Sequence, residues 1–243
     1  MKIIAKYEGG SKSYGLNNQD SDLDIRGCFL NTEISKIIGL SRHEHENKMD
    51  AENDVQLFEL RHFLNLLRKG NTQCLEMLHN DVWLEKSIEF DYIQAKKCYL
   101  LDSEKIYKCF RAYSFSERNL IFGRAHLGRI GEKRKKAIET FGYSYRNCCH
   151  AFRLLRSAII FFKEDYFPVN ISECDKEFGA MIRDIKFNPE KYQPEKLEAN
   201  LIDLEKELDY SFEQRKTNYI YNEEVANKIC FELYMPILKN FKT

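Results

Sequence analysis

The spacing of hydrophobic positions changes near residue 100. Before that point the chain has short apolar or alternating runs, which are typical of β-strands, and one longer segment with leucines at helical spacing. That segment ends at a Lys-Gly-Asn stop. The predicted elements of this part are strands at residues 2–7, 23–30 and 54–58, helices at residues 34–40 and 59–68, and a polar loop at residues 41–53.

From residue 103 onward, long helical patterns follow one another, with breaks at residues 163–168 and 188–194. The predicted helices cover residues 103–127, 128–141, 144–163, 194–215 and 223–238. The sequence therefore predicts an α+β fold, in which a small mixed-sheet head is followed by a helical body. We expect two domains, at residues 1–100 and 101–243.

Composition narrows the class of protein. The 243 residues are 43% hydrophobic, which indicates a folded protein, and 38 basic residues balance 38 acidic ones. A net charge of zero argues against a protein that coats nucleic acid by charge alone, but it leaves room for a local basic patch. The 8 cysteines include no Cys-x-x-Cys pair, so no zinc site is expected. Without a signal peptide or an apolar run of about 18 residues, we expect a cytoplasmic protein with reduced thiols and no membrane contact.

The candidate chemistry lies between the first two predicted strands. Gly9, Gly10 and Ser11 form a tight turn after a strand, and the backbone N–H groups of such a turn can face an anion. The tetrapeptide Ser-Asp-Leu-Asp then places Asp22 and Asp24 two residues apart, on one face of a strand. Two adjacent carboxylates repel each other unless a cation or a proton lies between them. A phosphate-binding turn followed by such a pair is typical of metal-assisted phosphoryl transfer.

Each part of this pattern has an ordinary interpretation when it is taken alone. A Gly-Gly-Ser turn is usually only a turn, and an Asp-x-Asp is usually a solvated face or a helix cap. The combination of the turn, a short loop, Ser-Asp-x-Asp and an apolar strand is much rarer, and it favours the functional interpretation.

One motif and two later segments resemble a known family. Residues 10–15 and 21–27 resemble the nucleotidyltransferase signature of the DNA polymerase β superfamily, and in detail they resemble the predicted RNA-repair-ligase-associated polymerase β-like proteins of bacteria and phages. Residues 60–78 and 142–155 are similar to later helices of that family. One departure is Arg146, where the family pattern leads us to expect a lysine; the positive charge is kept, but a lysine-specific role would be lost.

The resemblance implies a role for each matching residue. Ser11, with the backbone of Gly10, would bind the β- and γ-phosphates of a nucleoside triphosphate. Asp22 and Asp24 would ligate two Mg²⁺ or Mn²⁺ ions, and a third carboxylate on a neighbouring strand would complete the site.

Asp54 is the best candidate for that third carboxylate, because it opens a predicted strand directly before a helix. Its ordinary interpretation is a helix cap or a loop aspartate. Asp50 and Glu52 are weaker rivals, because they lie in the predicted polar loop.

The helix predicted at residues 144–163 carries a second set of candidates. Arg146, His150 and Arg153 lie at positions i, i+4 and i+7, hence on one helix face. Such a face can bind a triphosphate or RNA phosphates. The alternatives are a solvated basic surface and a histidine packed between helices; the resemblance favours nucleotide binding.

Two further clusters are less informative. The basic run at residues 124–136 predicts either an RNA-facing patch or an ordinary wet helix surface, and the sequence does not separate the two. The His-Glu-His-Glu cluster at residues 43–46 lacks a scaffold for a metal ion, so we interpret it as part of a solvated loop.

Together these features predict a nucleotidyltransferase with a two-metal mechanism that transfers a nucleoside monophosphate to an acceptor hydroxyl and releases pyrophosphate. The expected acceptor is an RNA or tRNA 3′ end. The alternatives are a protein side chain or a small molecule as the acceptor, and an inactive homologue that only binds nucleotide. The sequence leaves the base preference and the oligomeric state open.

Overall fold

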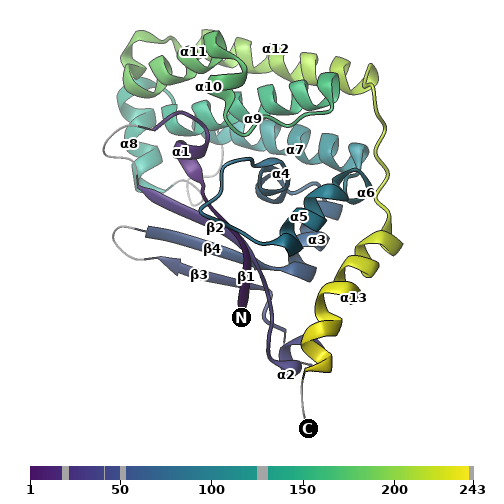
Figure 1. Ribbon diagram of the computed structural model, residues 1–243. Helices are drawn as coiled ribbons and strands as arrows, with labels where there is room; N and C mark the ends of the chain where they lie inside the picture. Colours follow the sequence, from purple (N-terminus) through teal and green to yellow (C-terminus); the bar gives the residue numbers. More distant parts are fainter. Residues whose placement is uncertain (18–21, 41, 50–52, 125–130, 241–243) are drawn as a thin grey trace. The chain divides into compact units, whose positions relative to one another are not determined.

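The computed structural model describes residues 1–17, 22–40, 42–49, 53–124 and 131–240 (Figure 1). The internal contacts divide the chain into two compact units. Unit 1 comprises Met1–Ser13, Asn17–Ile106 and Asn218–Thr243, and unit 2 comprises Tyr14–Leu16 and Tyr107–Thr217. Each unit combines segments that are distant in the chain. The division into domains at residues 1–100 and 101–243 stays a prediction.

Unit 1 contains a five-stranded mixed sheet with the strand order β3-β4-β2-β1-β5 (Figure 1). The strands are β1 (Lys2–Glu8), β2 (Leu23–Leu30), β3 (His45–Met49), β4 (Asn53–Glu59) and β5 (Glu85–Lys86). The β2–β4 pair is parallel, whereas β1–β2, β3–β4 and β1–β5 are antiparallel. The expected α+β fold, a mixed sheet followed by a mostly helical region, is confirmed.

The central strand β2 has a different character in its two halves. In its first half Ile25 is buried, whereas Asp24 and Arg26 point to the other face and are only partly buried. Its second half is buried throughout, as expected for a strand that is paired on both sides and covered by a helix. The first half of β2 therefore presents polar side chains without disturbing the core.

The prediction of a loop over residues 41–53 was wrong for residues 45–49, which form β3. This strand pairs antiparallel with β4 at the edge of the sheet, with His45 opposite Phe58. An edge strand gains its backbone hydrogen bonds from one neighbour and tolerates polar side chains. The His-Glu-Asn segment therefore forms a strand without the alternating apolar pattern that would have predicted one.

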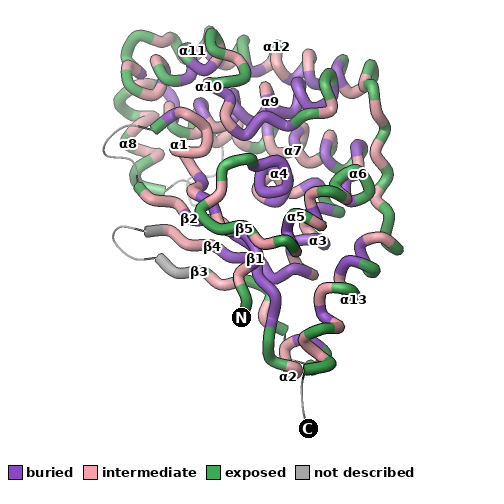
Figure 2. The backbone as a smooth tube through the Cα atoms, in the orientation of Figure 1, coloured by how far each residue is buried: buried purple, intermediate pink, exposed green. Residues whose placement is uncertain are grey.

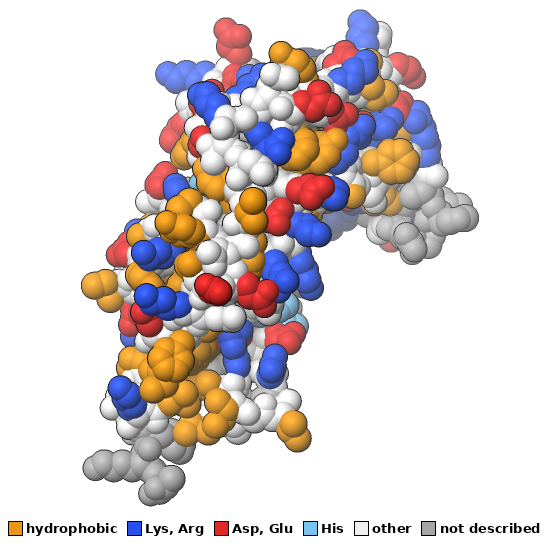
Figure 3. All heavy atoms as spheres, turned by 90° about the vertical axis from the view of Figure 1, so that its right-hand side faces the viewer, with side chains coloured by type: hydrophobic (Ala, Val, Ile, Leu, Met, Phe, Trp, Pro, Cys, Tyr) orange, Lys and Arg blue, Asp and Glu red, His pale blue; other side chains and the backbone are white. Residues whose placement is uncertain are grey.

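The helices of unit 1 pack on the sheet and on one another: α3 contacts β2 and β4, and α5 contacts β1. These helices are α1 (Gly10–Ser13), α2 (Ile34–Ile37), α3 (Leu60–Arg68), α4 (Thr72–His79), α5 (Ile88–Ala95), α6 (Lys97–Leu100) and α13 (Glu223–Lys239). Although α13 comes last in the chain, it packs against α3 and α6. On the face that carries α13, charged side chains of both signs lie among hydrophobic ones (Figure 3), in keeping with the net charge of zero.

Unit 2 is helical in the part that the structure describes. It holds most of α7 (Ser103–Ile121), followed by α8 (Glu132–Phe141), α9 (Tyr145–Glu164), α10 (Ile171–Cys174), α11 (Lys176–Phe187), the short 3₁₀ helix η2 (Pro189–Lys191) and α12 (Pro194–Glu213). Helix α9 is the core of this unit: it packs against α11 and α12, and it is buried along most of its length (Figure 2).

The predicted long helices agree with α7, α8, α9, α12 and α13 apart from their ends, whereas α11 was not predicted. In the described part of the chain, no helix is both long and apolar enough to span a membrane.

Candidate active site

The parallel pairing of β2 and β4 places two of the predicted carboxylates side by side. Asp24 on β2 is the direct register partner of Asp54 on β4. Both side chains remain accessible to solvent, with exposed fractions of 26% and 44%. The structure thus brings Asp24 and Asp54 to one place on the sheet, from positions 30 residues apart in the sequence.

Arg26 lies between these two carboxylates. Its Nη2 donates to Asp54 Oδ2 at 2.8 Å and lies 3.5 Å from Asp24 Oδ1, while its Nη1 donates to the backbone carbonyl of Asp54 at 2.9 Å. Arg26 lies within the motif at residues 21–27, but the resemblance implies no role for it. The available signal was its spacing, because residues 24 and 26 of one strand share a face.

Partial burial and the neighbouring charged side chains shift the pKa of Asp24. Burial raises the pKa of the Asp24 carboxyl above its usual value, and the nearby Asp54 and Asp22 carboxylates raise it further, whereas the Arg26 guanidinium lowers it. Asp22 itself precedes β2 and is exposed. Within the described ranges, no group of three or more His, Cys, Asp or Glu side chains is arranged to hold a metal ion.

The Asp24–Asp54 pair nevertheless fits a divalent cation. Its donors are carboxylate oxygens, which Mg²⁺ and Mn²⁺ prefer, and a cationic group already lies between them in the form of the Arg26 guanidinium. Mg²⁺ is commonly held by one or two carboxylates together with substrate phosphates, so a pair is a sufficient protein contribution. The rivals Asp50 and Glu52 lie outside the described residues.

The Gly-Gly turn packs tightly against Asp24 and Arg26 of β2. Gly9 N–H donates to the Asp24 carbonyl at 2.8 Å, and Gly10 has a φ of +62°, in the left-handed region that favours glycine. A Cβ atom on Gly10 would lie 1.7 Å from Asp24 Oδ2, and one on Gly9 would lie 2.8 Å from Arg26 Cγ. Both glycines are therefore required by the side chains of β2, and the turn holds the N-terminus of α1 beside the Asp24 carboxylate.

The three candidates on α9 belong to unit 2, and they do not form a uniform basic face. Arg146 is exposed, but Arg153 is fully buried, with its Cζ 3.5 Å from the centroid of the Tyr14 ring and its Nη2 3.4 Å from His150 Nδ1. Burial and the neighbouring guanidinium lower the pKa of His150 to about 3, so this imidazole is neutral at pH 7. Their role in nucleotide binding stays a prediction.

Residues 14–16, which continue the glycine-containing motif, are tied to the helices of unit 2. Ser172 Oγ donates to the Gly15 carbonyl at 3.1 Å, and Lys186 Nζ donates to the Leu16 carbonyl at 2.6 Å. Together with the ring of Tyr14 on Arg153, these contacts give the second half of the motif a packing role in unit 2.

The basic run at residues 124–136 is largely engaged in ion pairs where it is described. Arg124 makes two hydrogen bonds to Glu198, at 2.5 and 2.6 Å, and Arg134 donates to Asn147 at 3.1 Å. Lys135 pairs with Glu132 at 3.1 Å. Pairing of this kind suits a helix surface, and a contact with RNA stays a prediction.

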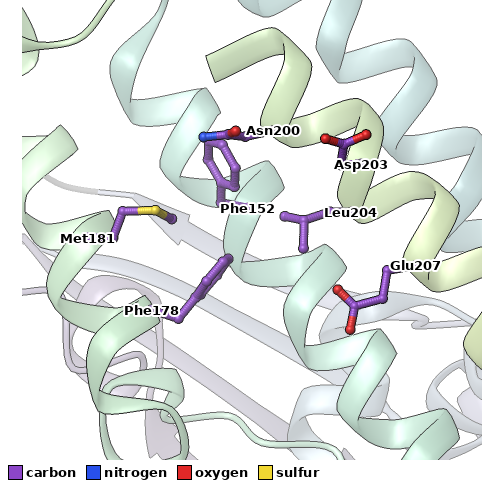
Figure 4. Close-up of a pocket in the computed structure, with 7 residues that line it drawn as sticks. All are labelled: Phe152, Phe178, Met181, Asn200, Asp203, Leu204 and Glu207. Carbon is purple, nitrogen blue, oxygen red and sulfur yellow. The ribbon is translucent and has the colours of Figure 1, made fainter. Parts of the chain in front are cut away.

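A pocket of about 240 Å³ lies in unit 2, between α9, α11 and α12 (Figure 4). It is lined by Phe152, Phe178, Met181, Asn200, Asp203, Leu204 and Glu207. Its two carboxylates are already balanced, since Glu207 pairs with Lys163 at 2.6 Å and Asp203 pairs with Lys206 at 2.9 Å. None of the residues predicted for the site lines it.

The chain is similar to several known proteins. The family model RlaP, described as "RNA repair pathway DNA polymerase beta family", matches residues 1–162. The uncharacterized protein YcgL of Bacillus subtilis (strain 168) is 34% identical over 83 residues, which cover 34% of this chain and only 32% of YcgL. The match thus spans about a third of that relative's length. A nucleotidyltransferase-like protein from Exiguobacterium sibiricum 255-15 has a TM-score of 0.34 at 10% identity, with 97% of this chain and 74% of that chain covered.

The family match includes the Gly-Gly turn and both strands that carry the paired carboxylates, and the resemblance seen in the sequence is confirmed. Since the match covers more than half of the chain, the protein belongs to the RlaP family, the RNA repair pathway DNA polymerase beta family.

Proposed function

We propose that the protein transfers a nucleoside monophosphate from a nucleoside triphosphate to the 3′-terminal hydroxyl of an RNA, a tRNA included. The observation that supports this most directly is the register of β2 and β4, which sets Asp24 beside Asp54 next to a glycine turn. RNA is the proposed acceptor because the family is named for an RNA repair pathway.

In this proposal Asp24 and Asp54 hold Mg²⁺ or Mn²⁺, and Asp22, which is exposed just ahead of β2, adds a further carboxylate when substrate is bound. A bound divalent cation would supply charge neutralisation for the triphosphate and acidify the acceptor hydroxyl. Ser11 and the backbone of Gly10 bind the β- and γ-phosphates at the start of α1.

The reaction is an in-line displacement at phosphorus. The acceptor oxygen forms a bond to the α-phosphorus, the bond from the α-phosphorus to the oxygen that bridges to the β-phosphate breaks, and pyrophosphate leaves with that electron pair. The hydroxyl proton passes to the Asp54 carboxylate and from there to solvent. The protein contributes position and electrostatic stabilisation rather than covalent chemistry.

The test is to incubate the protein with each of the four α-³²P-labelled triphosphates, Mg²⁺ or Mn²⁺, and total RNA, and then to separate the RNA, protein and small-molecule fractions. We expect the label in RNA, and Asp24→Asn should reduce it to the level without protein. Asp81→Asn is the matched control, because Asp81 is an exposed aspartate outside the site.

Label in protein, or in a small molecule other than the triphosphate and its hydrolysis products, would replace RNA as the acceptor and leave the chemistry in place. Absence of any such labelled product from all three fractions, combined with retained nucleotide binding, would identify an inactive homologue and refute the proposed activity.

A further inference from the structure

Arg26 occupies the place that a cation would take between Asp24 and Asp54. One nitrogen, Nη2, reaches both carboxylates, at 3.5 and 2.8 Å, and Nη1 is held by the backbone carbonyls of Ile25 and Asp54, at 3.0 and 2.9 Å. The Arg26 side chain is only 14% exposed, and its stem packs against Gly9, where a Cβ atom would collide with it. The guanidinium is therefore built into the site rather than lying loosely over it.

The negative charges of Asp24 and Asp54 explain why the Arg26 guanidinium lies between them. Two carboxylates side by side on paired strands repel each other, and repulsion of this kind is relieved by a cation between them. In the described part of the chain, Arg26 is the basic residue that forms an ion pair with either of these aspartates. A divalent cation that binds the same oxygens meets a positive charge already in position.

We propose that the Arg26 guanidinium is the resident counter-ion of the Asp24–Asp54 pair, that it competes with the divalent cation for these oxygens, and that it moves to the phosphates of an incoming nucleoside triphosphate. This inference rests on the proposed function. A guanidinium is suited to such an exchange, because its planar set of donors pairs with carboxylate and with phosphate in the same way.

The proposal links two binding events. Metal alone must displace the guanidinium without offering it another anion, so metal alone binds weakly. Metal and triphosphate together provide that anion, so each strengthens binding of the other. Arg26→Gln should therefore change the two affinities in opposite directions, whereas loss of a merely structural residue would weaken both.

The first experiment titrates Mn²⁺ into the nucleotide-free protein and follows free Mn²⁺ by electron paramagnetic resonance. We expect Arg26→Gln to bind Mn²⁺ about tenfold more tightly than the unchanged protein, because removing one positive charge about 5 Å from a divalent ion has roughly that effect even at the dielectric constant of water. Arg68→Gln is the matched control: Arg68 is half-exposed at the end of α3 and pairs with Glu223.

The second measurement is the affinity for a triphosphate with a non-cleavable α,β-linkage at saturating Mn²⁺. Arg26→Gln should bind it roughly 10- to 150-fold more weakly, the usual effect of losing a charge-assisted hydrogen bond. Equal or weaker Mn²⁺ binding by Arg26→Gln would overturn the competition, and unchanged nucleotide affinity would overturn the move to phosphate.

The Mn²⁺ titration also distinguishes failure of the proposed function from failure of the inference on Arg26. If neither the unchanged protein nor Arg26→Gln binds Mn²⁺ with or without nucleotide, the Asp24–Asp54 pair is not a metal site, and both proposals fall. If both bind Mn²⁺ but Arg26→Gln shows no gain, only the inference on Arg26 fails.

A third measurement does not depend on the folding of a glutamine variant. The side-chain ¹⁵N–¹H signal of Arg26, identified by its absence in Arg26→Lys, is followed in the unchanged protein. We expect it to shift when Mg²⁺ and the non-cleavable triphosphate are added together and to stay near its starting position with millimolar Mg²⁺ alone. If the Arg26 signal does not shift when Mg²⁺ and the non-cleavable triphosphate are added together, the proposed exchange is refuted.

Discussion

Arg153 is a charged side chain with no exposed surface, and its guanidinium lies over the Tyr14 ring at 3.5 Å. A desolvated cation–π contact of this kind contributes about 2 kcal/mol or more, and deletion of the side chain would also leave a cavity. The contact joins α9 to the glycine-containing motif, so Arg153 supports the position of residues 14–16 whether or not it also meets a phosphate.

At the residue scale we predict that Arg153→Ala lowers the free energy of unfolding by about 2–4 kcal/mol, because it removes both the stacking and the packing. Arg146→Ala, on the exposed part of the same helix, should change it by less than about 0.5 kcal/mol. Urea denaturation of both variants checks this. Similar small losses in the two would contradict the packing role and return Arg153 to the nucleotide-binding interpretation.

At the scale of elements, the site depends on the Gly9–Gly10 turn between β1 and α1. Asp24 Oδ2 approaches the Gly10 backbone so closely that no side chain fits there. The turn therefore fixes how near the phosphate-binding backbone comes to the carboxylates, and a change in it should alter activity more than stability.

We predict that Gly10→Ala loses nucleotidyl transfer and lowers the free energy of unfolding by about 1–2 kcal/mol, from strain at a positive φ. Gly131→Ala is the control, because Gly131 has a φ of −65° and a Cβ atom there meets nothing within 4 Å. Its effect should stay within about 0.5 kcal/mol. Full activity in Gly10→Ala would show that the close approach to Asp24 is not needed.

At the scale of the whole molecule, the last helix completes the first unit. The Tyr234 hydroxyl on α13 donates to the buried carboxylate of Glu59 at the end of β4, and it accepts from the Asn31 N–H at 3.3 Å. Upstream of α13, the Asn222 N–H donates to the Tyr99 carbonyl at 2.8 Å. Glu59 also accepts from Arg61 at 2.9 Å, so α13 closes a polar cluster at the start of α3.

We predict that a chain ending at Thr217 loses several kcal/mol of stability in unit 1, because it lacks the buried residues that α13 packs against α3 and α6 and the hydrogen bond from Tyr234 to Glu59. Tyr234→Phe should cost about 1–3 kcal/mol, and Tyr210→Phe, at an exposed tyrosine of α12, should cost almost nothing. Trp83 is the single tryptophan of the chain and belongs to unit 1, so its fluorescence reports this transition. An unchanged midpoint in the truncated chain would show that unit 1 does not need α13.

The sequence by itself determined the features that local chemistry controls. The glycine turn, the Asp22–Asp24 spacing, β1, β2 and the long helices were predictable, because alternation and helical periodicity record which face of an element is buried. The family resemblance is also visible in the sequence, because the residues of its main motif, 10–15 and 21–27, lie close together along the chain.

Only the tertiary structure decided which elements meet. Periodicity does not specify the partner of a strand, so the register that pairs Asp24 with Asp54 and leaves Arg26 between them depends on the packing of the whole sheet. The same reason accounts for β3, a polar edge strand that only its neighbour stabilises, and for the burial of Arg153 under Tyr14. The return of α13 to Glu59 likewise joins residues 175 positions apart, a distance over which no local pattern carries information.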